Sequence, residues 1–83
     1  MKPQFSNHAL QRMENRNISK ETVLKVIGSP DSVSLQNDFV AVYSKIVEID
    51  SKTYLYRVFV NSEKIPPLII TAYKTSKFEK YGY

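Results

Sequence analysis

The spacing of apolar residues changes at Gly28-Ser29-Pro30, and this change most constrains the fold. Before it, apolar residues recur three or four positions apart, as in an amphipathic helix. After it, they alternate with polar residues, as in strands. With 83 residues and no internal repeat, the chain is expected to form one small α+β domain.

Two short helices are expected in the first third of the chain. Ser6 is a plausible N-cap for a helix running to about Arg16, and Asn17 suits a left-handed position after it. Ser19 is a strong N-cap for a second helix over Lys20–Ile27, which Gly28 should end. The apolar faces of the two helices comprise Ala9, Leu10, Met13, Val23, Val26 and Ile27.

The alternating region predicts four strands separated by short turns. They are expected at Ser32–Gln36, Phe39–Ile49, Thr53–Val60 and Leu68–Thr75. Short turns between successive strands favour an antiparallel meander. The sequence therefore predicts two N-terminal helices packed on a four-stranded antiparallel sheet, with a short C-terminal helical turn over Lys77–Tyr83.

The two faces of the last two strands differ in chemistry. One face is nearly all apolar and is expected under the helices: Tyr54, Tyr56, Val58, Val60, Leu68, Ile70 and Ala72. The other mixes aromatic, basic and hydroxyl side chains: Leu55, Arg57, Phe59, Ile69, Thr71 and Tyr73. Such a face can hold a ligand, and a bulge in either strand would reverse part of this assignment.

Composition excludes several classes of site. The chain has no cysteine, so disulfides, thiolate metal sites and cysteine nucleophiles are absent, and one histidine with eight acids makes a zinc site improbable. We expect no metal and no cofactor. No apolar run approaches the roughly 18 residues of a membrane span, and we expect a cytoplasmic protein. A net charge of +4 favours a polyanionic partner.

His8, Arg12 and Arg16 are spaced four residues apart and form a basic row along the first helix. The row should border the apolar stripe, at the rim where the helix meets the sheet. An imidazole can move a proton, and guanidinium groups can hold phosphate oxygens and stabilise a growing negative charge. A solvated helix face with a rim histidine is the alternative reading, and both stay open.

The closing strand and the tail hold the other candidates. Thr71 and Tyr73 point the same way and can donate hydroxyl groups to a phosphate, although both residue types also simply favour strands. Arg57 interrupts an apolar strand, where an arginine is either solvent-facing or paired. It is a candidate substrate-binding residue, and a plain exposed-face residue is the alternative. Lys74 and Tyr81 belong to a basic and aromatic tail that can follow a nucleic-acid backbone or be a frayed end.

The run Phe5-Ser6-Asn7-His8-Ala9-Leu10-Gln11-Arg12-Met13-Glu14-Asn15-Arg16-Asn17-Ile18-Ser19 resembles the opening motif FSxHAxxRMxERGIS of an uncharacterised bacterial domain family. The helix ending in Pro30-Asp31 and the closing Ile70–Thr75 also resemble that family. Asn15 and Asn17 depart from its common Glu and Gly. The family in turn resembles the RelE/BrnT-like toxins of the barnase–EndoU–colicin–RelE grouping.

This resemblance implies a metal-independent endoribonuclease toxin that cleaves RNA through its ribose 2′-hydroxyl, held inactive by a cognate antitoxin. It implies catalytic roles for His8, Arg12, Arg16, Thr71 and Tyr73. Arg57, Lys74 and Tyr81 would bind the substrate. Two alternatives stay open: a non-catalytic module that binds RNA or protein, and a subunit that recruits a partner by strand addition at an exposed edge.

Overall fold

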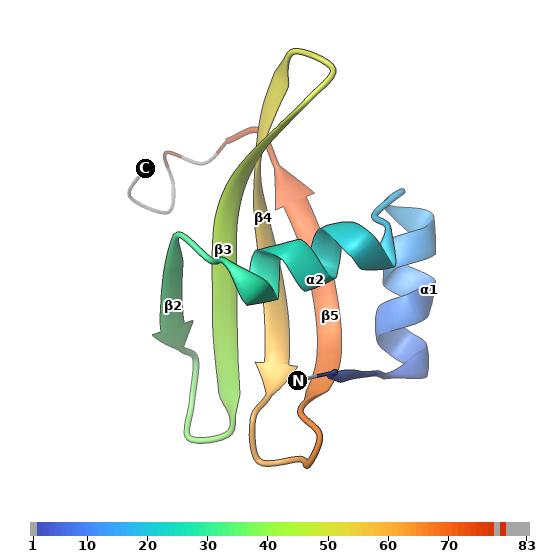
Figure 1. Ribbon diagram of the computed structural model, residues 1–83, viewed down its shortest axis with the longest axis vertical. Coiled ribbons are helices and arrows are strands. Elements are labelled where there is room, and N and C mark those ends of the chain that lie inside the picture. The colour runs from blue at the N-terminus through green and yellow to red at the C-terminus, as the bar shows by residue number, and fades with distance from the viewer. Residues whose placement is uncertain (1, 78, 80–83) are drawn as a thin grey trace.

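The structure is a computed structural model, and it describes residues 2–77 and residue 79. Two helices and a five-stranded sheet make up the fold (Figure 1). In chain order the elements are β1 (Gln4–Phe5), α1 (Asn7–Asn15), α2 (Lys20–Gly28), β2 (Ser32–Leu35), β3 (Val40–Ile49), β4 (Lys52–Asn61) and β5 (Leu68–Thr75). The strand order across the sheet is β1-β5-β4-β3-β2.

The prediction of a four-stranded antiparallel sheet is wrong. Gln4–Phe5 forms an additional strand that pairs in parallel with the start of β5, so the sheet has five strands and is mixed. Backbone hydrogen bonds from Gln4 and Ser6 to residues of the β5 region hold this strand in place. Two residues are too few to show an alternating pattern, and their partner lies more than 60 residues away.

The helices also differ from the predicted arrangement in how they meet the sheet. α2 crosses one face over β3 and β4, whereas α1 lies along the outer edge of β5 (Figure 1). The predicted caps are present, since the hydroxyls of Ser6 and Ser19 accept hydrogen bonds from Ala9 and Thr22. Asn17 has the expected left-handed backbone, with φ of 56°. Gly28 lies inside α2, which ends one residue later than expected.

A bulge corrects the predicted faces of β5. The pairing between β4 and β5 shifts between Phe59 and Val60, which places Ile69 opposite Val60 on the side of α2. Ile69 is fully buried there, although the strict alternation predicted it on the other face. Leu68 moves correspondingly to the face turned away from α2. The predicted C-terminal helical turn over Lys77–Tyr83 lies mostly outside the described residues.

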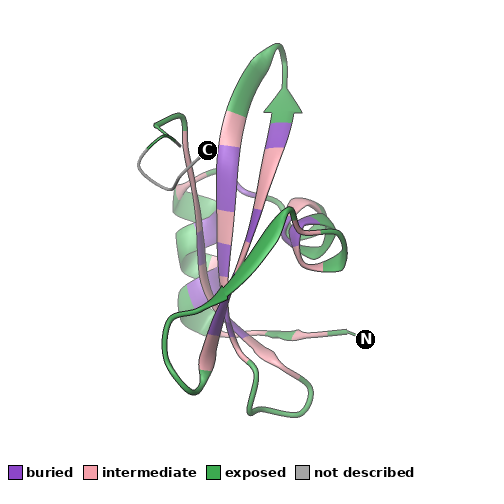
Figure 2. Cartoon of the chain, turned by 90° about the vertical axis from the view of Figure 1, so that its left-hand side faces the viewer, coloured by how far each residue is buried: buried purple, intermediate pink, exposed green. Residues whose placement is uncertain are grey.

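The core lies between the helices and the α2 side of the sheet. Its buried residues come from both helices, the turn between them and the three longest strands: Ala9, Met13, Ile18, Val23, Val26, Val47, Tyr56, Val58, Val60, Ile69 and Ala72. Figure 2 shows this burial running through the centre of the molecule, while β2 is exposed along its whole length. We call the face of the sheet turned away from α2 the outer face.

Candidate functional site

α1 carries the predicted histidine and its nearest arginine as an exposed pair. The Arg12 Nε donates a hydrogen bond of 3.4 Å to the His8 Nε2, one helical turn away. Ser6 begins this helix and also donates from its hydroxyl to the Ile70 carbonyl of β5, 3.3 Å away. The start of α1 is therefore fixed against the sheet, which gives the pair a defined position on the molecule.

Arg16 has a different environment from the other two members of the row. It is half-buried, and its Nη1 donates a hydrogen bond of 2.8 Å to the carbonyl of Ala72 in β5. That carbonyl lies on the stretch of β5 beyond its pairing with β1. Arg16 thus ties the end of α1 to the edge of the sheet, a structural contact that the sequence reasoning did not anticipate.

A cluster of basic and aromatic side chains lies on the outer face. The Arg57 Nη1 donates a hydrogen bond of 2.7 Å to the Tyr73 hydroxyl. The rings of Phe59 and Tyr73 stack with centroids 6.0 Å apart and planes 29° apart. The Arg57 guanidinium lies 5.6 Å from the Phe59 ring centre and 5.8 Å from that of Tyr73. Such contacts between a cation and ring faces are attractive.

Strand register explains why these side chains meet. Arg57 is paired with Tyr73 across the β4–β5 ladder, and Phe59 is paired with Thr71. Directly opposed residues of an antiparallel pair share one face, and so do residues two apart along one strand. The outer face therefore presents Arg57, Phe59, Thr71 and Tyr73 together, all half-exposed.

The basic row of α1 faces the same side of the molecule as this cluster. On α1, Glu14 lies on one flank of the buried stripe of Ala9 and Met13, and His8 and Arg12 lie on the other. The first flank borders a cavity on the α2 side of the sheet. The row with His8 and Arg12 therefore turns toward the outer face, along the edge of β5.

Lys74 does not join these residues. It pairs with Tyr56 across the ladder, one position out of phase with Tyr73, so it lies on the α2 side. Its Nζ is 5.2 Å from the ring centre of Tyr54 and 6.0 Å from that of Tyr56. The eighth candidate, Tyr81, lies outside the described residues.

Two residues of chemical interest were not singled out by the sequence reasoning. Phe59 was noted only as part of a mixed face, although its position two residues after Arg57 was a usable signal. Tyr56 was assigned to the apolar face, where it is indeed buried, and it also lines the cavity on the α2 side. Burial, followed by the neighbouring Tyr54, raises the pKa of Tyr56 above its ordinary value.

Residues 2–77 and 79 contain neither a metal-binding cluster nor a membrane-spanning helix. No group of three or more histidine, cysteine, aspartate or glutamate side chains gathers there in a way that can hold a metal ion. No helix in that part of the chain is long and apolar enough to cross a membrane.

A family model matches the chain from Phe5 of β1 through Lys74 of β5. Residues 5–74 match the model of a family described as a domain of unknown function (DUF4258). The chain belongs to this family. The match includes the basic row of α1 and the outer-face cluster, so both lie within the DUF4258 domain. No curated protein matches the chain, and neither does any solved structure.

Proposed function

We propose that this DUF4258 protein is a metal-independent endoribonuclease of a toxin–antitoxin system. One observation carries the proposal: a histidine–arginine pair and an arginine–aromatic cluster face the same side of a basic protein. The first group has the side chains for proton transfer and charge stabilisation. The second has those for holding phosphate and stacking bases. The resemblance of the opening motif to RelE/BrnT-like toxins supports the same function.

The proposed reaction is an internal transesterification. The ribose 2′-hydroxyl loses its proton to His8, and its oxygen attacks the adjacent phosphorus. The bond from phosphorus to the 5′-oxygen breaks, and that oxygen takes up a proton from water, while protonated His8 returns its proton to the solvent. The products are a 2′,3′-cyclic phosphate and a 5′-hydroxyl. Arg12 stabilises the charge that grows on the phosphate oxygens in the transition state.

The outer-face cluster positions the RNA in this proposal. Arg57 offers its guanidinium to a phosphate, and Thr71 and Tyr73 offer hydroxyl groups. Phe59 and Tyr73 present ring surface to an unpaired base. Arg16 contributes by fixing α1 to β5, since its guanidinium is engaged with the Ala72 carbonyl. We propose the cytoplasm as the location and a cognate antitoxin as the protein partner.

The test is cleavage of end-labelled RNA in the presence of EDTA. Wild-type protein is compared with His8→Ala and Arg12→Ala, and with Gln11→Ala, which changes an exposed neighbour on the same helix. We expect each of the first two variants to lose about 100-fold or more in rate, and the Gln11 variant to cleave like wild type. The ends should carry cyclic phosphates.

The alternative is a non-catalytic RNA-binding module, and the stacked cluster of Arg57, Phe59 and Tyr73 is the observation that favours it. Such a module would bind RNA with strongly salt-dependent affinity and produce no new RNA ends. The cleavage assay is repeated with ribosomes added. If no ends appear in either assay while RNA still binds, the binding module replaces the ribonuclease. If His8→Ala cleaves at the wild-type rate, the proposed mechanism is wrong.

A further inference from the structure

A cavity of about 390 Å³ opens on the α2 side of the sheet, separate from the outer face. It lies between the end of α1, the beginning of α2 and the sheet, where β3, β4 and β5 contribute Ile49, Tyr56 and Lys74. Met13, Ile18 and Ile49 give it apolar walls, and Tyr56 and Lys74 contribute polar groups. Its size falls within the range of small-molecule sites.

Tyr56 is the buried polar side chain of this cavity. It is 2% exposed, and what surface it shows opens into the cavity that it lines. Its hydroxyl makes no hydrogen bond to any residue in the described part of the chain. No side-chain polar atom there is both sealed from solvent and unpaired, so this hydroxyl reaches the cavity. A buried hydroxyl that opens into a cavity is available to donate to a ligand.

The charged residues that line the cavity are one cation, Lys74, and one acid, Glu14. Lys74 is half-buried against the rings of Tyr54 and Tyr56, and no carboxylate among residues 2–77 and 79 lies within ion-pair distance of it. The beginning of α2 borders the cavity through Ser19 and Thr22. The first backbone N–H groups of a helix lack helical partners and favour negative charge. In α2 the Ser19 hydroxyl accepts from one of them, the Thr22 N–H, and Glu21 lies in the same turn.

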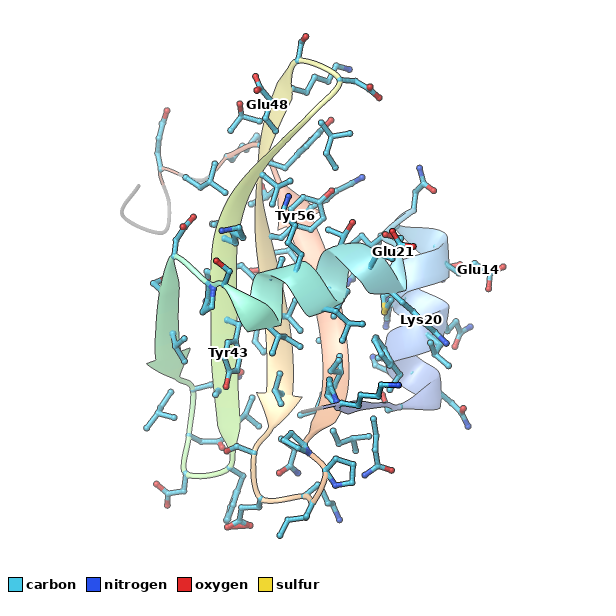
Figure 3. The ribbon with its side chains drawn as sticks, viewed as in Figure 1. Glu14, Lys20, Glu21, Tyr43, Glu48 and Tyr56 are labelled. Atoms are coloured by element: carbon cyan, nitrogen blue, oxygen red, sulfur yellow. The ribbon has the colours of Figure 1, made fainter. Side chains whose placement is uncertain are left out.

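Two acids lie near this cation, and Glu21, in the first turn of α2, does not line the cavity. Glu14 contributes to the cavity wall, but Figure 3 shows its side chain on the outer side of α1, pointing away from the sheet. Tyr56 lies in the same view beside α2, well separated from Glu14. The lining groups that can bind an anion are therefore the Lys74 ammonium, the Tyr56 hydroxyl and the polar side chains of Asn17, Ser19 and Thr22.

We propose that this cavity binds a small organic anion, a phosphate or carboxylate joined to a compact apolar or planar body. Lys74 and the Tyr56 hydroxyl hold the anionic group at the beginning of α2. The body of the ligand packs on Met13 and Ile49. This site is distinct from the ribonuclease proposed above, and its test needs no RNA.

The test is titration of the full chain, followed by amide chemical shifts, with three probes: inorganic phosphate, adenosine 5′-monophosphate and benzoate. We expect shifts centred on Ser19, Thr22 and Ile49 with at least one organic anion, and weaker binding of phosphate alone. A preference between the two organic probes distinguishes phosphate esters from carboxylates. The proposal is overturned if neither organic anion shifts these amides at about 10 mM, or if inorganic phosphate binds equally tightly.

Two variants and a control localise the binding. Lys74→Gln should weaken binding of the organic anion about 10-fold or more, and Tyr56→Phe, which keeps the buried ring, several-fold. Lys25→Gln removes the same charge from an exposed position on α2 outside the cavity and should bind like wild type. Equal affinity in the Lys74 and Tyr56 variants and the control would place the anion elsewhere and contradict the proposal.

Discussion

The two faces of the sheet use alternate residues of the same strands for different purposes. On the α2 side, Val58 and Ala72 are buried in the core, whereas their neighbours Arg57 and Tyr73 are half-exposed on the outer face. The outer face also has a fully buried residue, Leu55, which lies near the hairpin between β3 and β4. The comparison teaches that stability and proposed chemistry are separated by one position along a strand.

The largest expected difference between the faces concerns stability. Ile69→Ala removes a fully buried side chain from the core and should lower the free energy of unfolding by about 2–5 kcal/mol. Thr71→Ala on the outer face should lower it by less than about 1 kcal/mol. Urea denaturation of both variants checks this. Equal losses would show that the outer face is also a packed core.

The next difference lies within the basic row. Arg16→Met removes the hydrogen bond to the Ala72 carbonyl and should lower the free energy of unfolding by about 1–2 kcal/mol. Arg12→Met, at an exposed position, should change it by less than about 0.5 kcal/mol. Thermal unfolding of the pair measures this. Arg16 has no structural role if its variant unfolds at the same temperature as the Arg12 variant.

A smaller effect should appear at alkaline pH. Burial raises the pKa of Tyr56, so in the unfolded chain this phenol ionises first, near its ordinary value of 10.0. The contribution of the protonated Tyr56 phenol to the free energy of unfolding is therefore complete below pH 10. It is lost as pH rises through the higher folded pKa. Tyr56→Phe should lose less stability than wild type between about pH 8 and about pH 11. Parallel pH profiles in urea unfolding would contradict the assignment.

The smallest effect is expected at the edge of the sheet. Leu35 of β2 is 75% exposed, so Leu35→Lys should change the free energy of unfolding by less than about 0.5 kcal/mol. Chemical denaturation measures it. If Leu35→Lys lowered the free energy of unfolding as much as Ile69→Ala, the Leu35 side chain of β2 would have to be packed like a core residue.

Local signals in the sequence predicted the caps and most strands. Ser6 and Ser19 cap their helices, Asn17 has a left-handed backbone, and Leu68–Thr75 has the predicted bounds. These features depend on neighbouring residues, which a sequence displays directly. The strand Gln4–Phe5 depends on a partner more than 60 residues away, and no local pattern encodes that pairing.

The candidate site was predictable in part for the same reason. Spacing along α1 indicated that His8 and Arg12 are neighbours, and they are in contact. Alternation along β5 placed Thr71 and Tyr73 on one face with Arg57, as the register has them. Arg16 was harder, because its partner is a backbone carbonyl that carries no residue-specific signal. The side chain of Lys74 lies on the opposite face, among tyrosines.

The most direct test of the central claim is to map where RNA contacts the protein. An RNA oligonucleotide with a 2′-deoxy substitution cannot be cleaved, and it can be titrated while amide shifts are recorded. The account predicts shifts on the outer face, at Arg57, Phe59 and Tyr73, and along the His8 flank of α1. Shifts confined to α2 and the cavity beside Tyr56, with the outer face unchanged, would contradict it.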